Sequence, residues 1–368
     1  MTDSNNTSRL DKYLSGFAKR VPVAVLFGGR GHEHAVSLVS AEHFMQKARA
    51  EGFPILPIFI DRQGGYNIFL WETDALPPTL PEELLIPTYP VCIGGECGFL
   101  AEGKIVAVAC AVPILHGDFG EDGVVQGALI SAKIPLIGCD SVSGAVCADK
   151  AYTKWIAASL GIPTLRSVLI NASGEITRER VSEWCDIASQ KLGYPMFVKP
   201  CRLGSSVGAS EAMSRDELAE AIIAAARVCP RIMIEPSLTD KRELECAYLC
   251  SGGRLTVTDP GEVDVGGEFY SYEEKYSSHS GAKVISRARV ESAVRETVVR
   301  YTAKLAAAIG IGSFARFDYF LSGDGQIYFN EINTIPGMTE GSLYPKMLAE
   351  CGIDFGLFVR LLLSGCAQ

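Results

Sequence analysis

Four polar residues lie close together on two short runs that alternate between apolar and polar positions. Arg316 and Asp318 belong to the run before the turn cluster Ser322–Gly325, and Glu331 and Asn333 belong to the run after it. Side chains two positions apart on a strand point to the same face, so each pair shares a face of a predicted β-hairpin. The chemistry of such a face is the binding of Mg²⁺ together with phosphate oxygens, because Asp, Glu and Asn supply hard oxygen ligands.

The expected register brings both pairs onto one face of the hairpin. A two- or four-residue loop pairs position 318 with 329 and position 316 with 331, and it leaves Phe317, Tyr319 and Ile332 on the opposite face. An arginine beside the acids suits negative charge that develops on a phosphoryl or carbonyl oxygen. The alternative is a hairpin whose charges simply face water, and a bulge or a three-residue loop would break the shared face.

Composition places the chain among globular proteins of two or three domains. It has 368 residues, of which 48% are hydrophobic and 21% are charged. The net charge of -9, with no long basic run, argues against nucleic acid or an anionic membrane as the main partner. No apolar run reaches the roughly 18 residues of a membrane span. Residues 1–20 do not resemble a secretory signal, and we expect a disordered or helical tail there.

The 12 cysteines favour a reducing cytoplasm. They lie mostly inside apolar runs, and no CxxC pair occurs. The closest spacings are Cys92/Cys97 and Cys246/Cys250, and neither has a histidine nearby. We therefore expect small buried thiols rather than disulfides or zinc ligands.

The first 140 residues have the pattern of an open α/β sheet. A buried run over residues 21–27, a helical pattern over 37–50 and a second buried run over 54–61 predict a βαβ unit, and so a parallel sheet. The intervening loop lacks the G-x-G-x-x-G pattern of dinucleotide folds. It places Glu33 above a strand end, where such sheets bind ligands, although Glu33 can also serve as a cap for the following helix.

A second polar loop follows the buried run over residues 105–115. His116 comes first, and three glycines and three acids follow it up to Gly123. We expect a tight loop at the carboxyl end of a strand, before a helix over residues 124–132. His116 is a candidate site residue, although single histidines also serve structural roles.

A third loop has the chemistry of a phosphate cradle. Lys199 ends a predicted strand, and the glycines and serines of residues 204–208 offer backbone N–H groups. The loop differs from G-x-x-x-x-G-K-S/T, which disfavours a P-loop NTPase, and a mobile surface loop is the alternative. Beyond it, Glu235 and Glu243 can bond an adenine amino group or a ribose. The aromatic and charged segment 268–281 suits a lid over a ligand.

Together and in this order, these motifs resemble those of the D-alanine–D-alanine ligases, a family of ATP-grasp carboxylate-amine ligases. The resemblance extends from Val21 to Phe355 and rests on FGGRGHEHAVSL, HGDFGEDGVVQG, the Asp149-Lys150 helix, VKPCRLGSSVG, YSYEEKY, RFDYF and NEINTIPGMTEGSLYP. It implies an α/β fold, α+β in the C-terminal half, with an N-terminal open parallel sheet followed by a two-lobed ATP-grasp fold. The implied parts are a tail over 1–20, a substrate-binding domain over 21–140, a central lobe over 141–240, and a C-terminal lobe with lid and metal site over 241–368.

The resemblance also implies a reaction. ATP phosphorylates the carboxylate of one D-alanine, and the amine of a second D-alanine attacks this acyl phosphate to give D-alanyl-D-alanine for peptidoglycan precursors. The implied cofactors are ATP and two Mg²⁺ ions, with Mn²⁺ as a substitute, and the implied state is a cytoplasmic homodimer. A rival ATP-grasp ligase, of the biotin carboxylase or glutathione synthetase type, would keep the metal set but not Glu33, Tyr276 and the Ser-Leu-Tyr-Pro stretch.

Individual roles are implied by the match to family motifs. The implied Mg²⁺ ligands are Asp318, Glu331 and Asn333. The implied ATP-binding residues are Lys150, Lys199, Ser206, Glu235 and Glu243. Arg316 and the backbone N–H of Gly337 match the pair that stabilises the acyl phosphate and the tetrahedral oxyanion.

The two amino acid substrates have their own matched residues. Glu33 matches the acid that binds the ammonium of the first D-alanine, in a hydrogen-bonded triad with the hydroxyls of Ser205 and Tyr276, and His116 lies beside this substrate. The groups matched to the carboxylate of the second substrate are Ser342 and Lys275. Related ligases for D-lactate or D-serine tend to carry Arg where this chain has Leu343. We therefore expect D-alanine as the second substrate, with D-serine as the runner-up.

Overall fold

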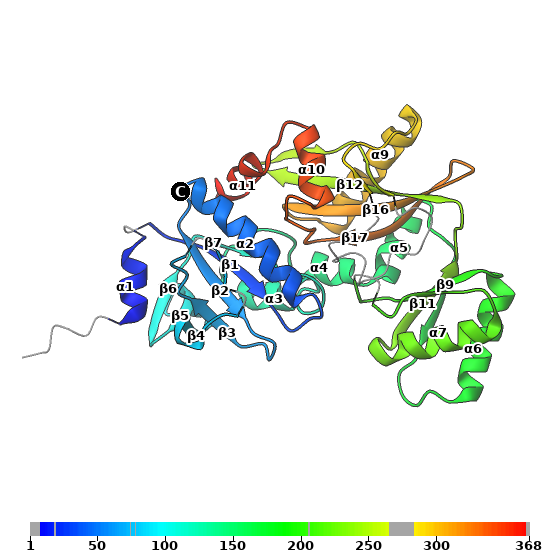
Figure 1. Cartoon of the computed structure of the whole chain (residues 1–368), viewed down its shortest axis with the longest axis horizontal. Helices are drawn as coiled ribbons and strands as arrows, with labels where there is room; N and C mark the ends of the chain where they lie inside the picture. The colour runs from blue at the N-terminus through cyan, green and yellow to red at the C-terminus, as the bar shows by residue number, and fades with distance from the viewer. Residues whose placement is uncertain are drawn as a thin grey trace, which may run out of the picture.

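The computed structural model describes residues 8–17, 20–73, 75–77, 79–204, 207–264 and 283–365. Within these ranges three β-sheets follow one another along the chain, with helices packed on their faces (Figure 1). The blue and cyan sheet occupies one end of the molecule, and the two C-terminal sheets occupy the other end.

The first sheet has the strand order β6-β5-β4-β3-β2-β1-β7. Strand β1 pairs in parallel with β2 and β7, which confirms the predicted βαβ unit. The remaining pairs are antiparallel, and no α-helix connects these strands: the links are turns, apart from the longer stretch 70–84 between β3 and β4. The sheet is therefore mixed rather than parallel throughout. Its strands are β1 (Val23–Gly28), β2 (Ile55–Ile60), β3 (Tyr66–Phe69), β4 (Leu85–Ile93), β5 (Glu96–Ala101), β6 (Lys104–Ala107) and β7 (Cys110–Pro113).

Helices of the N-terminal half pack on this sheet. They are α1 (Arg9–Ser15), α2 (His34–Ala50), the short 3₁₀ turn η1 (Glu82–Leu84) and α3 (Val124–Ser131), whereas α4 (Ser141–Ala148) packs against α3 and against the third sheet. Helix α1 falls in the predicted tail, where its Leu10 is fully buried against the sheet. We expected a disordered or a helical tail, and residues 9–15 are helical.

The second sheet has four antiparallel strands in the order β10-β9-β11-β8. They are β8 (Val168–Asn171), β9 (Met196–Pro200), β10 (Ser210–Ala212) and β11 (Arg231–Pro236). Two helices lie side by side on it, α6 (Arg178–Lys191) and α7 (Arg215–Val228), whereas α5 (Lys150–Ser159) lies toward the third sheet (Figure 1). Helix α7 begins at a Ser214 cap and buries Leu218, Ile222 and Ala225 at helical spacing.

The third sheet has the strand order β15-β14-β12-β16-β17, and β13 pairs with β12. The strands are β12 (Lys241–Ser251), β13 (Arg254–Val257), β14 (Gly261–Asp264), β15 (Lys283–Ile285), β16 (Phe314–Ser322) and β17 (Ile327–Asn333). The helices of this part are α9 (Ser292–Ile309), α10 (Leu343–Glu350) and α11 (Phe355–Leu363).

The β16–β17 hairpin confirms the two predicted strands but corrects their register. Asp318 pairs with Glu331 and Arg316 pairs with Asn333, each two residues away from the expected partner. The register shifts just beyond Asp318, because a β-bulge adds one residue to β17 at position 330. The bulge precedes both Glu331 and Asn333, so the shared polar face survives. The opposite face buries Phe317, Tyr319 and Ile332.

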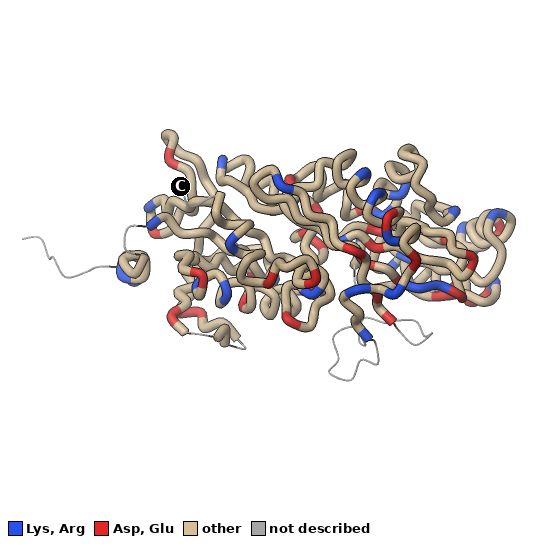
Figure 2. The backbone as a smooth tube through the Cα atoms, turned by 90° about the horizontal axis from the view of Figure 1, so that it is seen from above, with Lys and Arg blue, Asp and Glu red and all other residues tan. Residues whose placement is uncertain are grey.

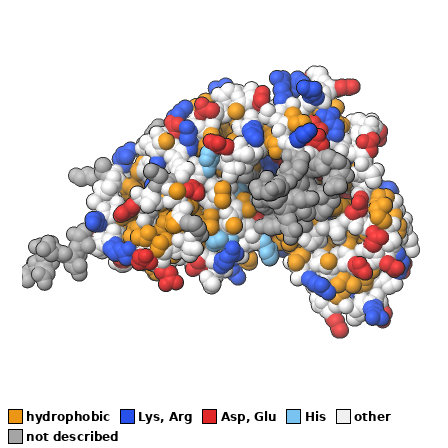
Figure 3. Space-filling model, viewed as in Figure 1, with side chains coloured by type: hydrophobic (Ala, Val, Ile, Leu, Met, Phe, Trp, Pro, Cys, Tyr) orange, Lys and Arg blue, Asp and Glu red, His pale blue; other side chains and the backbone are white. Residues whose placement is uncertain are grey.

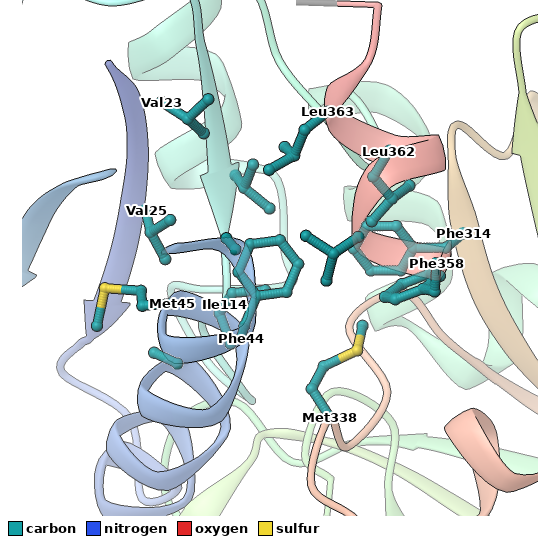
Figure 4. Close-up of a cluster of buried hydrophobic side chains, with 14 of the residues drawn as sticks. Val23, Val25, Phe44, Met45, Ile114, Phe314, Met338, Phe358, Leu362 and Leu363 are labelled. Atoms are coloured by element: carbon teal, nitrogen blue, oxygen red, sulfur yellow. The ribbon is translucent and has the colours of Figure 1, made fainter. Parts of the chain in front are cut away.

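One buried cluster joins the first and third sheets (Figure 4). It combines N-terminal and C-terminal side chains that include Val25, Phe44, Ile114, Phe314 and Phe358. Helix α11 packs against α2, and Arg360 of α11 forms an ion pair with Glu51 at the end of α2. The two ends of the chain therefore share one core.

The cysteines differ from expectation at one pair. Cys92 and Cys97 form a disulfide across the β4–β5 hairpin, so the prediction of free thiols is wrong there. These residues face each other directly in the strand register, which brings their side chains together. Among the described cysteines, seven others are buried thiols, Cys250 is half-buried and Cys351 is exposed.

Candidate active site

A charged face on the third sheet brings the four hairpin residues together. Arg316 donates two hydrogen bonds of 2.8 Å to the two carboxylate oxygens of Asp318, and Asn333 donates one of 2.9 Å to Asp318 Oδ2. Glu245 on β12 lies opposite Asp318 in the register, and its Oε2 is 3.1 Å from Arg316 Nε. Sequence reasoning missed Glu245, because only the pairing of β12 with β16 brings it here.

The acids around Arg316 fix its charge. Burial opposes the guanidinium charge, but Asp318 and then Glu245 raise the pKa of Arg316 well above its ordinary value. Arg316 is therefore a permanent cation at the centre of this face. It is suited to stabilise negative charge that develops on a bound substrate.

Two lysines reach the same face from other elements. Lys150 at the start of α5 has its Nζ 2.9 Å from Glu331 Oε2. Lys199 at the end of β9 donates to Asn330 Oδ1 at 3.0 Å and lies 2.6 Å from Glu235 Oε2. Both predicted phosphate-binding lysines thus contact β17, the strand that holds two of the predicted metal ligands.

Asp149 holds the start of α5 against the third loop. It is the N-cap of this helix, is 1% exposed, and accepts a 3.0 Å hydrogen bond from the backbone N–H of Ala151. Its other carboxylate oxygen pairs with Arg202 at 3.0 Å and Arg231 at 3.2 Å. These contacts fix the position of the adjacent Lys150.

Glu235 lies in a buried ionic cluster. It is 1% exposed and contacts Lys199 through one carboxylate oxygen and Lys154 of α5 through the other. Burial opposes its ionisation, but the two lysines lower the pKa of Glu235 below its ordinary value. Its role in adenosine binding stays a prediction. Lys154 was missed, although its spacing of four from Lys150 places both on one side of the helix.

Glu243 lies further along the same face of β12. It is half-buried, and its Oε1 is 2.8 Å from Lys241 Nζ, which lies 4.3 Å above the ring of Phe320 on β16. In the strand register Glu243 faces Phe320, whereas Arg316 faces Ala247. The face therefore has an aromatic and acidic end, suited to a nucleoside, and a catalytic end around Arg316.

Three loops converge on Glu33. This residue is 9% exposed and is the N-cap residue of α2, so its charge lies at the positive end of the helix, although its side chain makes no capping hydrogen bond. Its carboxylate lies against Gly117 and Gly204, where an added Cβ would be 2.5 Å and 3.1 Å from Oε2. Only a residue without a side chain fits at Gly117, which also has φ 73°.

Two further titratable groups lie around Glu33. His116 is buried, and its Nε2 is 2.9 Å from Ser40 Oγ. Burial lowers the pKa of His116 below its ordinary value, so this imidazole is neutral at pH 7. Burial, followed by the charge of Glu33, raises the pKa of Glu121 to about 8. The sequence analysis did not single out Glu121.

The surroundings of Glu33 adjoin the charged face. The charge of Arg316 acts on both His116 and Glu121, and Thr334, just beyond β17, lies 3.5 Å from Glu121 Oε2. A carboxylate for a substrate ammonium and a guanidinium for developing negative charge are therefore neighbours. This is the arrangement that the amino acid and phosphate chemistry requires.

The segment after β17 places the remaining described candidates. Ser342 Oγ lies 2.8 Å from Thr339 Oγ1, and a Cβ at Gly337 would be only 2.6 Å from Ser342 Oγ. Leu343 is 5% exposed and packs in the core that joins the two ends of the chain, so its contact with a substrate stays a prediction. Outside the described residues lie Ser205, Ser206, Lys275, Tyr276 and the rest of the predicted lid.

The donor set of the charged face fits a hard cation. Asp318 and Glu331 offer carboxylates and Asn333 an amide, which leaves other positions to phosphate oxygens and water, as Mg²⁺ prefers. Across the ranges that the structure covers, no group of three or more His, Cys, Asp or Glu could hold a metal ion.

These features define the ATP-grasp fold, which solved structures similar to this chain share. The VanG D-Ala:D-Ser ligase from Enterococcus faecalis has a TM-score of 0.83 and 31% identity, and the match covers 95% of this chain and 100% of that chain. The D-alanyl-alanine synthetase A from Vibrio cholerae has a TM-score of 0.81 and 29% identity, with 95% and 99% coverage.

Sequence comparison gives the family. Family models described as D-ala D-ala ligase N-terminus and C-terminus match residues 22–139 and 156–364. The D-alanine--D-alanine ligase of Mycobacterium ulcerans is 36% identical over 358 residues, which cover 92% of this chain and 93% of that protein. The corresponding Treponema pallidum protein is 36% identical over 362 residues, 95% and 88% of the two chains. The chain belongs to the D-alanine–D-alanine ligase family.

Proposed function

We propose that this protein joins two D-alanines into D-alanyl-D-alanine, a peptidoglycan precursor, in an ATP-dependent and ADP-forming reaction. One observation carries the proposal. The buried Glu33 carboxylate lies beside the face where Arg316, the acids Asp318 and Glu331, and two lysines gather. An amino acid held at Glu33 therefore presents its carboxylate to a phosphate donor held on that face.

In the first step, a D-alanine carboxylate oxygen attacks the terminal phosphorus of ATP, the bond from that phosphorus to the bridging oxygen breaks, and ADP leaves as the acyl phosphate forms. Lys150 and Lys199 exchange Glu331 and Glu235 for phosphate oxygens. Mg²⁺ held by Asp318, Glu331 and Asn333 neutralises charge on the phosphates when it is bound.

In the second step, the amine of the second D-alanine attacks the acyl carbon, and phosphate leaves. Arg316 and the backbone N–H of Gly337 stabilise the oxyanion of the tetrahedral intermediate. Glu33 holds the first ammonium beside the neutral His116, with Ser205 and Tyr276 as its hydroxyl partners. Ser342 and Lys275 hold the carboxylate of the second substrate.

The direct test is turnover with defined substrates. We expect ADP and phosphate release from ATP to require D-alanine, with one dipeptide, identified by mass spectrometry, for each ADP. Turnover that depends instead on bicarbonate or on a glutamyl peptide would contradict the assignment and favour another ATP-grasp ligase.

D-serine is the second candidate for the attacking amino acid. It is favoured by the likeness to a structure named as a D-Ala:D-Ser ligase. Leu343, which stands where related D-serine and D-lactate ligases tend to carry Arg, favours the methyl group of D-alanine over the hydroxymethyl group of D-serine. A difference of this kind in a substrate site is worth roughly 1–3 kcal/mol. In a competition among equal amounts of D-alanine, D-serine and D-lactate, we expect D-alanyl-D-alanine to dominate. A majority of D-alanyl-D-serine would assign the alternative.

We also propose a homodimer in the cytoplasm, where ATP is supplied. Val124 and Ile130 of α3 and Val142 of α4 are 56%, 45% and 68% exposed, and these two helices pack together. Such apolar exposure suits a partner surface. Sedimentation equilibrium should give twice the mass of one chain.

In the parts of the chain that the structure describes, no helix is long and apolar enough to cross a bilayer.

The division into three parts at residues 140 and 240 stays a proposal. Each sheet draws its strands from one part of the chain, which supports these boundaries. Figure 3 shows the face viewed as in Figure 1, where charged side chains of both signs are spread among apolar ones, and Figure 2 shows that basic and acidic positions both occur along the length of the backbone.

A further inference from the structure

Three buried charged side chains form a row beside the phosphate loop. Lys154, Glu235 and Lys199 are 3%, 1% and 7% exposed. Lys154 Nζ contacts Glu235 Oε1, and Lys199 Nζ lies 2.6 Å from Glu235 Oε2. One carboxylate therefore holds two lysines that come from a helix and from the strand before the loop.

The two lysines are not equivalent. Lys199 has a second, uncharged partner in Asn330 Oδ1 at 3.0 Å, and it lies at the end of β9. Lys154 lies on the buried side of α5, one turn beyond Lys150. Lys199 is thus the member of the row that is placed to turn toward a nucleotide phosphate.

The reorientation of Lys199 toward a phosphate would be unfavourable without Lys154. In a chain without Lys154, the departure of Lys199 would leave the buried carboxylate of Glu235 with no cation beside it, and an unpaired buried charge is strongly unfavourable. Burial lowers the pKa of Lys154 to about 8, so this lysine still carries its proton at pH 7 and keeps Glu235 paired.

We infer that Lys154 is a positioning residue for ATP: it holds the charge of Glu235, and thereby releases Lys199 to bind a phosphate of the nucleotide. The inference rests on the proposed function, because it takes Lys199 as a phosphate ligand. Without Lys154, Lys199 stays paired with Glu235, and the nucleotide phosphates lose one cationic ligand.

The test compares nucleotide binding by the full chain and its variants. Lys154→Met removes the charge at similar volume, and Lys191→Met, an exposed lysine at the end of α6, is the matched control. By isothermal titration calorimetry, we expect Lys154→Met to raise the Kd of ATP about tenfold, the equivalent of one charge-assisted hydrogen bond. The Kd of adenosine should change much less, and the control should bind like the parent.

A second pair of variants separates positioning from simple stability. Glu235→Gln removes the acid, so the further change Lys154→Met should cost no additional ATP affinity in that background. A tenfold additional loss there would show a merely structural role and overturn the inference, as would an unchanged Kd in Lys154→Met. This pair also decides the question if Lys154→Met alone does not fold. If the parent chain itself fails to bind ATP, the proposed function fails, not the role of Lys154.

Discussion

Each candidate-site cation that the structure describes has an acid or amide partner. Arg316 bonds Asp318, Lys150 pairs with Glu331, and Lys199 contacts both Glu235 and Asn330. Substrates therefore do not enter a site of free charges. They exchange partners with side chains that are already oriented, which reduces the reorganisation needed at the moment of reaction.

Removal of the central guanidinium should impair chemistry more than binding. In Arg316→Ala we expect kcat to fall by about a hundredfold or more, because the lost charge stabilises the transition state. The Kd of ATP, measured by calorimetry on the same preparation, should change far less. An unchanged kcat would contradict the role of Arg316.

Glu121 should make stability depend on pH. Its folded-state pKa of about 8 lies above the ordinary value of 4.5, so its contribution to stability is present below the ordinary value and is lost as pH rises through 8. In urea unfolding near pH 5 and pH 9, Glu121→Gln should gain free energy of unfolding relative to the parent at the higher pH. If the variant and the parent differ in free energy of unfolding by the same amount at both pH values, the raised pKa of Glu121 is not the cause. Glu96→Gln, at an exposed position, is the control.

At the residue level, sequence reasoning found the groups that lie within recognisable motifs. Strand alternation predicted that Arg316 shares a face with Asp318 and that Glu331 shares a face with Asn333. The hairpin brings the two pairs together, although in another register than the expected one. Glu245 and Lys154 could not be placed in this way. Their positions depend on which strand pairs with β16 and which side of α5 faces β11, and long-range packing decides both.

At the level of elements, the hairpin shows how local pattern predicts strands better than register. The alternation identified β16 and β17, yet the pairing differs by two residues. Asn330 and Glu331 are adjacent and both half-buried, which breaks the period of two and marks the bulge. The proline-rich stretch 71–103 predicted only an irregular excursion with a few short strands, and their antiparallel pairing at the edge of the first sheet was not predicted.

Helix α4 depends on its first cap. Asp140 accepts hydrogen bonds of 2.8 Å from the backbone N–H and from the hydroxyl of Ser143, and these bonds lower its pKa. Asp140→Ala should reduce the free energy of unfolding by about 1 kcal/mol at neutral pH. Because the pKa is lowered, this contribution disappears as pH falls below the ordinary value of 3.8.

Urea unfolding at neutral pH and below pH 3 tests the cap. Glu183→Ala is the control, since Glu183 is an exposed acid within α6 and lies outside any cap and outside the proposed dimer surface. A loss in Asp140→Ala that is as large in acid as at neutral pH would assign the effect to something other than the charged cap.

At the level of the whole molecule, one core ties the two ends of the chain together. Phe358 is 1% exposed, and its ring lies 5.9 Å from that of Tyr344 and 6.1 Å from that of Phe314. Phe358→Ala should reduce the free energy of unfolding by about 3–5 kcal/mol through the cavity it leaves. Thermal unfolding measures this, with the 57% exposed Ile93→Ala as control. A loss as small as in the control would mean that the cluster does not join the two halves.

The contact of α11 with α2 has a consequence for biosynthesis. Arg360 and Glu51 are separated by 309 positions, so a ribosome makes α2 long before its partner exists. During that interval the nascent chain carries an apolar helix surface that nothing covers, which is a natural place for a chaperone to bind. The N-terminal sheet can form early, but its packing is completed only when the final helix emerges.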